Sequence, residues 1–391
     1  MRHAYPFIVA LLSMTLFLGA CGGTTSDEGS AKSSDANSQQ TLQALPDDCV
    51  LVNFPDDTGA DDYGERQKAF YAALEEALQN KAEKICIRNS LPLEVMRLYD
   101  LDHGIFWVKD FTPGARMWVQ LDSDEEKTDY QFYDFEYYDL SREEIDAMKR
   151  EIDDAADQIL AKIPSGADDW TTAKVIHDEL CGLVTYDHTQ EKAHARDLYG
   201  ALVNHEAMCS GYSIAFKYLI NKAGYSSTTS YSEDHAWNSV GVLSYDRYID
   251  TTWDDTDQFD KNGKPYIFDD YFFLKREEVT SIDSHAIVSG DPYLNYVNET
   301  VPYNYHAHEG YLADSYDIGA ITEMFRRQKD AGANVLTVRF ANDADYQAAL
   351  AWSDGGSDIG TLLGNIGYAG SYYFWNNDNV KVIDIGLYPA E

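Results

Sequence analysis

Apolar residues recur at helical spacing in several segments, with short strand-like runs between them. Between Glu65 and Lys81 apolar side chains return every three or four positions, which predicts a helix, and Lys84–Arg88 predicts a short strand directly after it. Ser141-Arg142-Glu143-Glu144 has the pattern of a capping box, so we expect a long helix to begin there and to end before Pro164. The first part of the chain therefore combines helices with strands.

The pattern continues through the rest of the chain. Runs rich in aromatic and β-branched residues predict strands at 105–108, 117–121 and 130–138, and a second amphipathic helix runs from Ala173 to Leu183. After about residue 300 the pattern starts again, with helices predicted at 318–329 and 346–352 and strands predicted at 335–340 and within 372–387. These elements predict a small C-terminal α/β appendage over residues 301–391, and its strands are too apolar to face water.

The composition describes a globular protein with an acidic surface. The 391 residues are enough for one large domain or two ordinary ones. With 67 acidic against 30 basic side chains, the net charge of −37 would repel a polyanion, and no basic stripe interrupts it. A hydrophobic share of 44% is too high for a disordered chain. Nucleic-acid binding and intrinsic disorder are both excluded on these grounds.

The N-terminus has the features of an export signal. Arg2 and His3 precede an apolar run from Ala4 to Ala20, which closes on Leu18-Gly19-Ala20-Cys21 and resembles a bacterial lipoprotein signal. A membrane-spanning helix is the alternative, but spans lack this ending of small residues and cysteine. We expect residues 1–20 to be the signal peptide, Cys21 to carry the lipid, and the polar residues 21–45 to form a flexible tether. The protein would then be an extracytoplasmic lipoprotein, attached to the membrane through Cys21.

Export also changes how the remaining cysteines are interpreted, because disulfides persist outside the cytoplasm. Cys49 and Cys86 either form a disulfide or remain two buried thiols, and the sequence favours neither alternative. Cys181 lies one helical turn after His177, which suggests either a second catalytic dyad or, as we favour, a small buried thiol.

The candidate nucleophile is Cys209. It precedes the helical stretch 214–223, which Gly224 ends, so we expect Cys209 at the N-terminus of a helix. The positive end of the helix dipole favours a thiolate there, and Gly211 leaves room for a substrate backbone. The alternative is a cysteine that only fills space in the core.

A histidine and an aspartate follow Cys209 in the order that thiol catalysis uses. His235 opens one strand-like run, and Asp250 lies in the next one, Tyr248–Trp253, after a turn near residues 244–247. A thiol needs an imidazole to take its proton, and the imidazole needs a carboxylate to fix its tautomer. We therefore expect His235 and Asp250 to be in contact across two neighbouring strands.

From about Trp170 to Leu274 the chain resembles the transglutaminase-like superfamily. The resemblance rests on four segments, namely Tyr199-Gly200-Ala201-Leu202, Cys209 with Gly211-Tyr212, His235-Ala236-Trp237-Asn238, and Asp250-Thr251-Thr252-Trp253-Asp254. It implies an α+β fold with a papain-like cysteine-enzyme core at residues 169–300, preceded by an N-terminal α/β segment at 46–168. It also implies that Cys209 is the nucleophile, His235 the general base and then acid, and Asp250 the orienting carboxylate.

The same resemblance implies that Tyr212, Trp237 and Trp253 line the substrate cleft, with core packing as the alternative for each. No cofactor or metal is expected. The acidic residues from Asp254 to Asn262 lack the spacing of an EF-hand loop, and His306 with His308, Glu309 and His285 lacks a further spaced zinc ligand.

Together these features predict a thiol enzyme that attacks amide bonds of a protein or peptide substrate in the cell envelope through an acyl-enzyme thioester. Water as the acceptor would make it a protease or amidase, and an amine would make it a transglutaminase. The alternative is a binding or scaffold module that keeps the fold with little or no catalysis. We expect the C-terminal appendage to pack on the N-terminal segment, away from Cys209.

Overall fold

The computed structural model describes residues 48–53, 63–88, 104–119, 128–232, 234–242, 245–285, 304–354 and 357–388. The predicted signal peptide, the lipidated Cys21 and the tether at 21–45 lie outside this set. Among the described residues, no helix combines the length and the apolar character needed to cross a bilayer.

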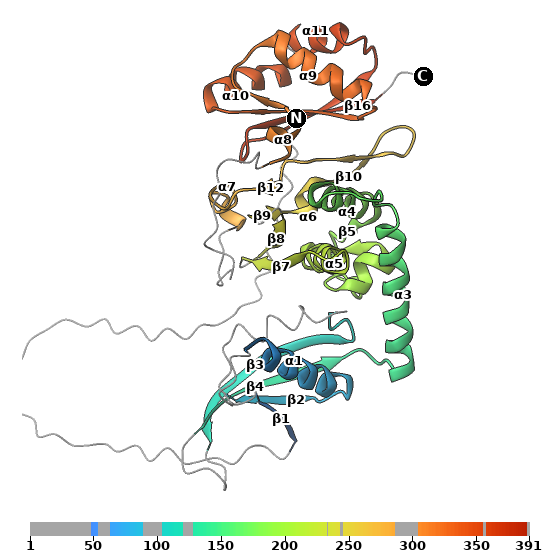
Figure 1. Ribbon diagram of the computed structural model, residues 1–391, viewed down its shortest axis with the longest axis vertical. Helices are drawn as coiled ribbons and strands as arrows, with labels where there is room; N and C mark the ends of the chain where they lie inside the picture. Colours follow the sequence, from blue (N-terminus) through green and yellow to red (C-terminus); the bar gives the residue numbers. More distant parts are fainter. Residues whose placement is uncertain are drawn as a thin grey trace, which may run out of the picture. The chain divides into compact units, whose positions relative to one another are not determined.

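The N-terminal segment forms a four-stranded sheet with one helix (Figure 1). The strand order is β1-β2-β4-β3, with bounds β1 Cys49–Asn53, β2 Lys84–Arg88, β3 Val108–Val119 and β4 Thr128–Tyr137. Helix α1, Tyr63–Gln79, joins the parallel strands β1 and β2, which confirms the predicted helix followed by a strand. Cys49 and Cys86 form a disulfide between these strands, with their Cα atoms 5.9 Å apart.

Two long helices follow this sheet. Helix α3, Arg142–Leu160, begins at the predicted capping box, because the Ser141 hydroxyl accepts from the Glu144 amide and the Glu144 carboxylate accepts from the Ser141 amide. Helix α4, Asp169–Leu183, begins at Asp168, whose carboxylate accepts from the Thr171 amide. Both helices were predicted, and both turn an apolar face toward the core.

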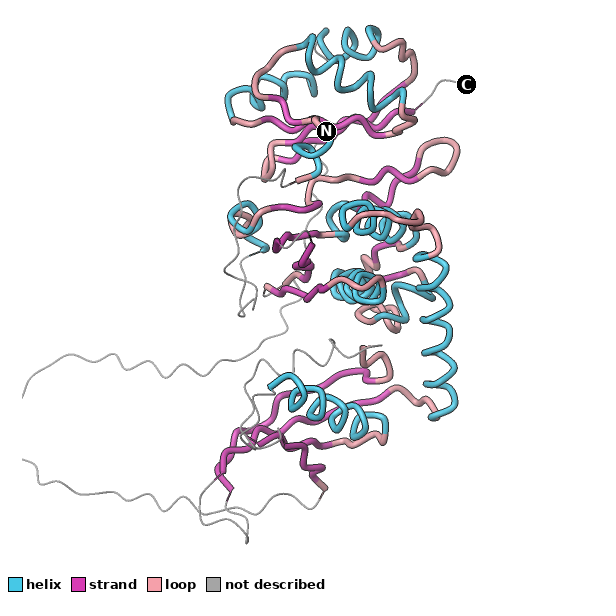
Figure 2. Tube along the Cα trace, viewed as in Figure 1, coloured by secondary structure: helices cyan, strands magenta, loops and turns pink. Residues whose placement is uncertain are grey.

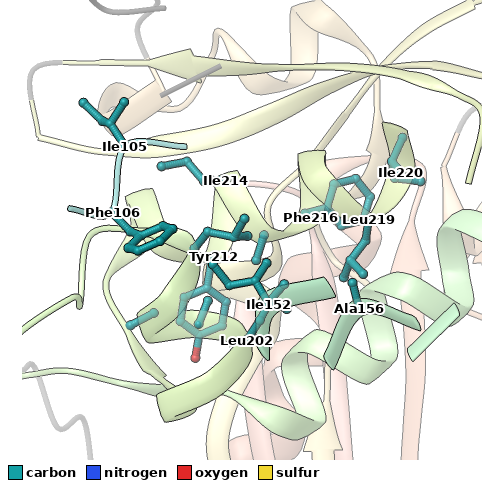
Figure 3. Packing of buried hydrophobic residues seen from close by; sticks show 14 of the residues in the cluster. Ile105, Phe106, Ile152, Ala156, Leu202, Tyr212, Ile214, Phe216, Leu219 and Ile220 are labelled. Carbon is teal, nitrogen blue, oxygen red and sulfur yellow. The ribbon is translucent and has the colours of Figure 1, made fainter. Parts of the chain in front are cut away.

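The central part of the chain is built around helix α5, Cys209–Lys222, and an antiparallel sheet. The sheet has the order β12-β9-β8-β7, with bounds β7 Ser226–Tyr231, β8 Ala236–Val242, β9 Tyr245–Ile249 and β12 Phe272–Leu274. Figure 3 shows side chains of α5, among them Phe216 and Leu219, close to Ile152 and Ala156 of α3. Most residues of α5 are buried, so the helix that carries Cys209 is fixed by packing on its neighbours.

Short elements connect these helices and strands (Figure 2). They are β5 Thr185–Tyr186, the π-helix η2 Gly200–Asn204, β6 Glu206–Ala207, α6 Thr251–Asp254, β10 Asp255–Phe259, β11 Pro265–Ile267, α7 Arg276–Val279 and the 3-10 turn η3 Asp283–His285. The strand predicted through Trp253 is wrong beyond Ile249, where β9 ends. Asp250 then accepts hydrogen bonds from the amides of Thr252 and Trp253 and caps α6. Such side-chain hydrogen bonds to nearby amides favour a cap over continued strand pairing.

The C-terminal unit is a small α/β structure with its own buried cluster. Its elements are α8 Tyr305–Glu309, β13 Leu312–Ala313, α9 Ile318–Asp330, β14 Val335–Phe340, α10 Asp343–Leu350, η4 Ala351–Asp354, α11 Ser357–Asn365, β15 Ser371–Asn377 and β16 Val382–Tyr388. The strand order is β13-β14-β16-β15. The predicted helix at 318–329 and the strand at 335–340 are confirmed, whereas α11 was not predicted.

The C-terminal unit packs against the central part of the chain, so the expectation that it packs on the N-terminal segment is wrong. Val380 and Val382 are buried in one cluster with Trp237 and Tyr271, and Asn377 donates to Asp270 at 2.8 Å. Arg339 of β14 pairs with Glu278 of α7. Val380 lies in the turn between β15 and β16. The alternation of buried and exposed side chains along a strand does not extend into this turn, so the sequence pattern did not indicate that Val380 is buried.

Replacing Val382 by alanine tests this packing. Val382 is 0% exposed, so removing two methyl groups should lower the free energy of unfolding by about 2 kcal/mol. Val50 is 41% exposed, and Val50→Ala, the matched control, should cost at most about 1 kcal/mol, chiefly through lost strand preference. Urea unfolding measures both changes, and equal costs would contradict the packing described here.

Candidate active site

Cys209 is the first residue of α5 and is partly exposed. The N-cap residue Met208 has an extended backbone and contributes no side-chain hydrogen bond to the helix. The first amides of a helix have no partner within the helix, so the positive end of the helix dipole lies beside Cys209. Asn238 of β8 donates to the carbonyl oxygen of Ser213 at 2.9 Å and thereby connects the N-terminal half of α5 to the sheet.

His235 and Asp250 are in contact, as the sequence predicted. His235 comes directly before β8 and Asp250 directly after β9, so the antiparallel pairing of these strands brings both residues to the same end of the sheet. The Nε2 atom of His235 lies 2.6 Å from the Oδ2 atom of Asp250, and both side chains are buried.

A second histidine contacts the same carboxylate. The Nε2 atom of His285, at the end of η3, lies 2.9 Å from Oδ2 of Asp250. His285 was considered only as a reserve zinc ligand in the sequence, so its place at this site was missed. It lies 35 residues after Asp250 in no recognisable motif, and only the fold brings the two together.

The electrostatics of Asp250 determine which ring nitrogens carry hydrogen. Burial by itself raises the pKa of Asp250, but the charge of His235 and the hydrogen bonds from both histidines outweigh burial and hold the pKa below its usual range. The group is therefore a carboxylate, which can only accept hydrogen bonds. Both histidines must therefore donate from Nε2, which leaves Nδ1 as the second nitrogen of the His235 ring.

Cys209 also interacts with the His235 ring. Burial lowers the pKa of His235, but the charge and hydrogen bond of Asp250, followed by a hydrogen bond and charge from Cys209, raise it to about 10. The ring is thus an imidazolium at neutral pH, with the Asp250 carboxylate at its Nε2 atom. The structure brings together the three residues that the sequence singled out.

The three aromatic residues predicted to line a cleft have different positions. Tyr212 is 0% exposed and Trp237 1%, so both belong to the core, which corrects the expectation for these two residues. The Tyr212 hydroxyl donates to Asp255, an interaction that an interior tyrosine needs. Trp253 is partly exposed, and its ring centroid lies 5.3 Å from that of His235, so among the three it is the residue at the surface of the site.

Gly211 has a structural role in the fold. A Cβ atom at this position would lie 2.8 Å from the carbonyl oxygen of Ala195 and from the Cβ atom of Ala207. The space that Gly211 leaves is therefore occupied by the chain itself, which corrects the expectation that a substrate backbone uses it.

Cys181 is a buried thiol, as we favoured. Its sulfur lies 3.8 Å from Nε2 of His177, and burial raises the pKa of Cys181 to about 12. Asp254 lies 3.1 Å from the same histidine nitrogen, and all three side chains are buried. A buried thiol with a raised pKa is poorly suited to nucleophilic attack.

Two clusters contain side chains of metal-ligand type. One is His235 with Asp250 and His285, and the other is His177 with Asp178 and Asp269. In the first cluster, the Nε2 atom of each histidine is hydrogen-bonded to the same oxygen of Asp250, and in the second, Lys174 pairs with both aspartates. The carboxylates of both clusters therefore already have partners within the protein.

The other residues considered as metal ligands lie apart from these clusters. His306 is in α8 and bonds to Thr337, while His308 stacks on Trp170. Both lie in the short helix α8. Asp260 accepts from the amides of Asn262 and Lys264, so it stabilises a turn.

Comparisons with known proteins give partial structural matches. No protein-family profile and no curated protein matches the sequence. A transglutaminase structure aligns at 15% identity and a TM-score of 0.25, over 44% of this chain and 52% of that one. Menin, in a structure that shows its binding site for the Mixed Lineage Leukemia protein, aligns at 22% identity and a TM-score of 0.24, over 35% of this chain and 31% of that one. A candidate cysteine protease from Cytophaga hutchinsonii aligns at 12% identity and a TM-score of 0.23, over 41% of this chain and 70% of that one.

The alignment thus spans about half of the transglutaminase and under a third of menin. Every one of these TM-scores is below 0.5, a level that does not establish a shared fold. The functional conclusion therefore depends on the side chains of this chain.

The raised pKa of His235 predicts how stability changes with pH. Folding raises this pKa from about 6.5 to about 10, so the stabilisation is fully present below about pH 6.5 and is lost as the pH rises through 10. The free energy of unfolding should fall over this window by at most about 1.4 kcal/mol per pH unit from this group. In Asp250→Asn, which removes the chief cause of the raised pKa, the fall should be shallower. Urea unfolding at several pH values measures both slopes, and identical slopes would contradict the assignment.

Proposed function

We propose that this chain is a cysteine enzyme of the transglutaminase-like superfamily, in which Cys209 attacks an amide carbonyl. The observation that carries the proposal is the position of His235, whose Nε2 atom bonds to a buried carboxylate while Cys209 at a helix N-terminus interacts with the same ring. A thiol, an imidazole and a carboxylate linked in this order are the groups that thiol acyl transfer requires.

The reaction would proceed in two halves. The Cys209 thiolate adds to the amide carbonyl, a carbon–sulfur bond forms, and the carbon–nitrogen bond breaks while His235 gives its Nδ1 proton to the leaving amine. The neutral ring then takes a proton from water or from an amine, which attacks the thioester and releases the Cys209 sulfur. Asp250 keeps the Nε2 hydrogen in place throughout.

Water and an amine use the same groups of the site and differ only in the acceptor that reaches the thioester. Protease or amidase activity and transglutaminase activity therefore both belong to the proposal. The substrate would be a protein or peptide of the cell envelope, because the signal-like N-terminus ending in Cys21 supports export and lipid anchoring. The disulfide between Cys49 and Cys86 is compatible with an oxidising compartment.

The binding-module alternative has less support. Tyr212 and Trp237 are buried, so they offer no recognition surface. Desolvating the charges of Asp250 and His235 is costly, and a module that only binds gains nothing from an imidazolium beside a cysteine.

Alkylation of Cys209 tests the enzyme proposal. At about pH 6 a free thiol is mostly protonated and reacts slowly with iodoacetamide. We expect Cys209 to react at least about tenfold faster in the unmodified protein than in His235→Ala, because the imidazolium stabilises the reactive thiolate. Peptide mapping by mass spectrometry quantifies the label on each cysteine of the full chain.

Cys181 serves as the internal control in the same sample. Its pKa is raised to about 12 by burial, so it should stay unlabelled while the protein is folded. Slow labelling of Cys209 that His235→Ala leaves unchanged would refute the activated nucleophile.

The proposed lipid anchor is tested separately. In a bacterial host fed labelled palmitate, the protein should incorporate the label and fractionate with membranes, whereas Cys21→Ser should do neither. Ser26→Ala in the same segment is the matched control and should behave like the unmodified protein. Membrane association of Cys21→Ser without the label would show that another feature anchors the chain.

A further inference from the structure

We infer that His285 is a positioning residue of the candidate active site, which holds the Asp250 carboxylate in the orientation that His235 needs. The inference rests on the function proposed above and adds a fourth side chain to the three named there. Nε2 of His285 lies 2.9 Å from Oδ2 of Asp250, the same oxygen that His235 contacts at 2.6 Å.

All hydrogen bonds to Asp250 together fix its carboxylate. Oδ1 accepts from the amides of Thr252 and Trp253 at 3.0 and 3.1 Å, and Oδ2 accepts from the two histidines. The two amides alone would restrain one oxygen and leave the second with His235 as its donor. His285 of η3 supplies the second donor to Oδ2. Rotation of the carboxylate would therefore break hydrogen bonds at both oxygens.

The need for a second donor follows from the proposed proton transfers. When His235 gives its Nδ1 proton to a leaving group, the ring becomes neutral and Asp250 loses its cationic partner. The Nε2 hydrogen of His285 remains in both states of His235. A buried carboxylate that keeps its hydrogen bonds stays ionised, and so it continues to hold the tautomer of His235.

The surroundings of His285 prevent water from taking over its role. Its side chain is 1% exposed, and its ring centroid lies 4.6 Å from those of both Trp237 and Trp253. Its Nδ1 atom lies 3.3 Å from the Ser284 hydroxyl, so that nitrogen can accept while Nε2 donates. The ring is thus held by contacts with two tryptophans and by a hydrogen bond at each nitrogen.

The backbone of His285 is also anchored. Its amide donates to the carbonyl of Ile282, and Ile282 and Val279 are buried in the cluster that contains Trp237. A histidine fixed in this way can orient the carboxylate it contacts, whereas a mobile surface histidine could not.

The test compares rates of Cys209 alkylation by iodoacetamide between about pH 5 and pH 9 in the full-length protein. His285→Leu removes the donor, and its rate at about pH 6 should fall at least about tenfold, since a hydrogen bond to a charged group contributes that much to an equilibrium. The glutamine amide in His285→Gln can place a donor near the position of Nε2, and it should restore most of the rate. A role in packing alone predicts no such rescue.

His306→Gln is the matched control. His306 is also fully buried, and its Nε2 atom bonds to Thr337 at 2.8 Å, away from the candidate site. Its replacement should lower the melting temperature but leave the alkylation profile unchanged. If His285→Leu changes only the melting temperature, as His306→Gln does, the inference is overturned.

A second measurement needs no His285 variant and applies if His285→Leu does not fold. Nitrogen-15 NMR of histidine-labelled protein should show hydrogen on Nε2 of His285, and a ring that carries hydrogen only on Nδ1 would overturn the inference. Failure of the proposed function has a different signature, because the unmodified protein would then react no faster than His235→Ala. Enhanced reactivity in the unmodified protein that His285→Leu retains would reject the role of His285 alone.

Discussion

The candidate site depends on one buried carboxylate. Asp250 is 2% exposed and ionised, and a charge in that position is stable only when hydrogen-bond donors surround it. The donors come from α6 directly after it, from His235 directly before β8 and from η3. These donors meet only when the pairing of β8 with β9, the cap of α6 and the η3 turn are all formed. The contacts that stabilise the charge of Asp250 are therefore the same contacts that set the geometry of the site.

The sequence predicted the parts of this arrangement that have local signals. The capping box at Ser141 and the helical spacing after it indicated α3, and the position of Cys209 before an apolar helical stretch indicated its place on α5. The His235–Asp250 contact could be expected because both residues flank neighbouring strands. The signals that indicated these features, namely a cap, a periodic apolar face or two neighbouring strand-like runs, each lie within about twenty residues of sequence.

The parts that were missed depend on contacts between distant segments. His285 has no local pattern that distinguishes it from any other histidine, and Val380 reaches the aromatic cluster from a turn of the C-terminal unit. The burial of Tyr212 and Trp237 likewise follows from packing that a motif does not encode. Asp250 ends β9 because its carboxylate caps α6, a role that the strand-like neighbours Thr251 and Thr252 do not indicate.

The contact of Val380 and Val382 with the aromatic cluster has a consequence for how the protein is made. Cys209, His235, Asp250 and His285 all precede these valines in the chain, so a ribosome synthesises them before the residues that pack beside Trp237. A partly synthesised chain that ends before β15 holds these four side chains but lacks the valines. The aromatic cluster next to His235 is therefore complete only when the last sheet has been made.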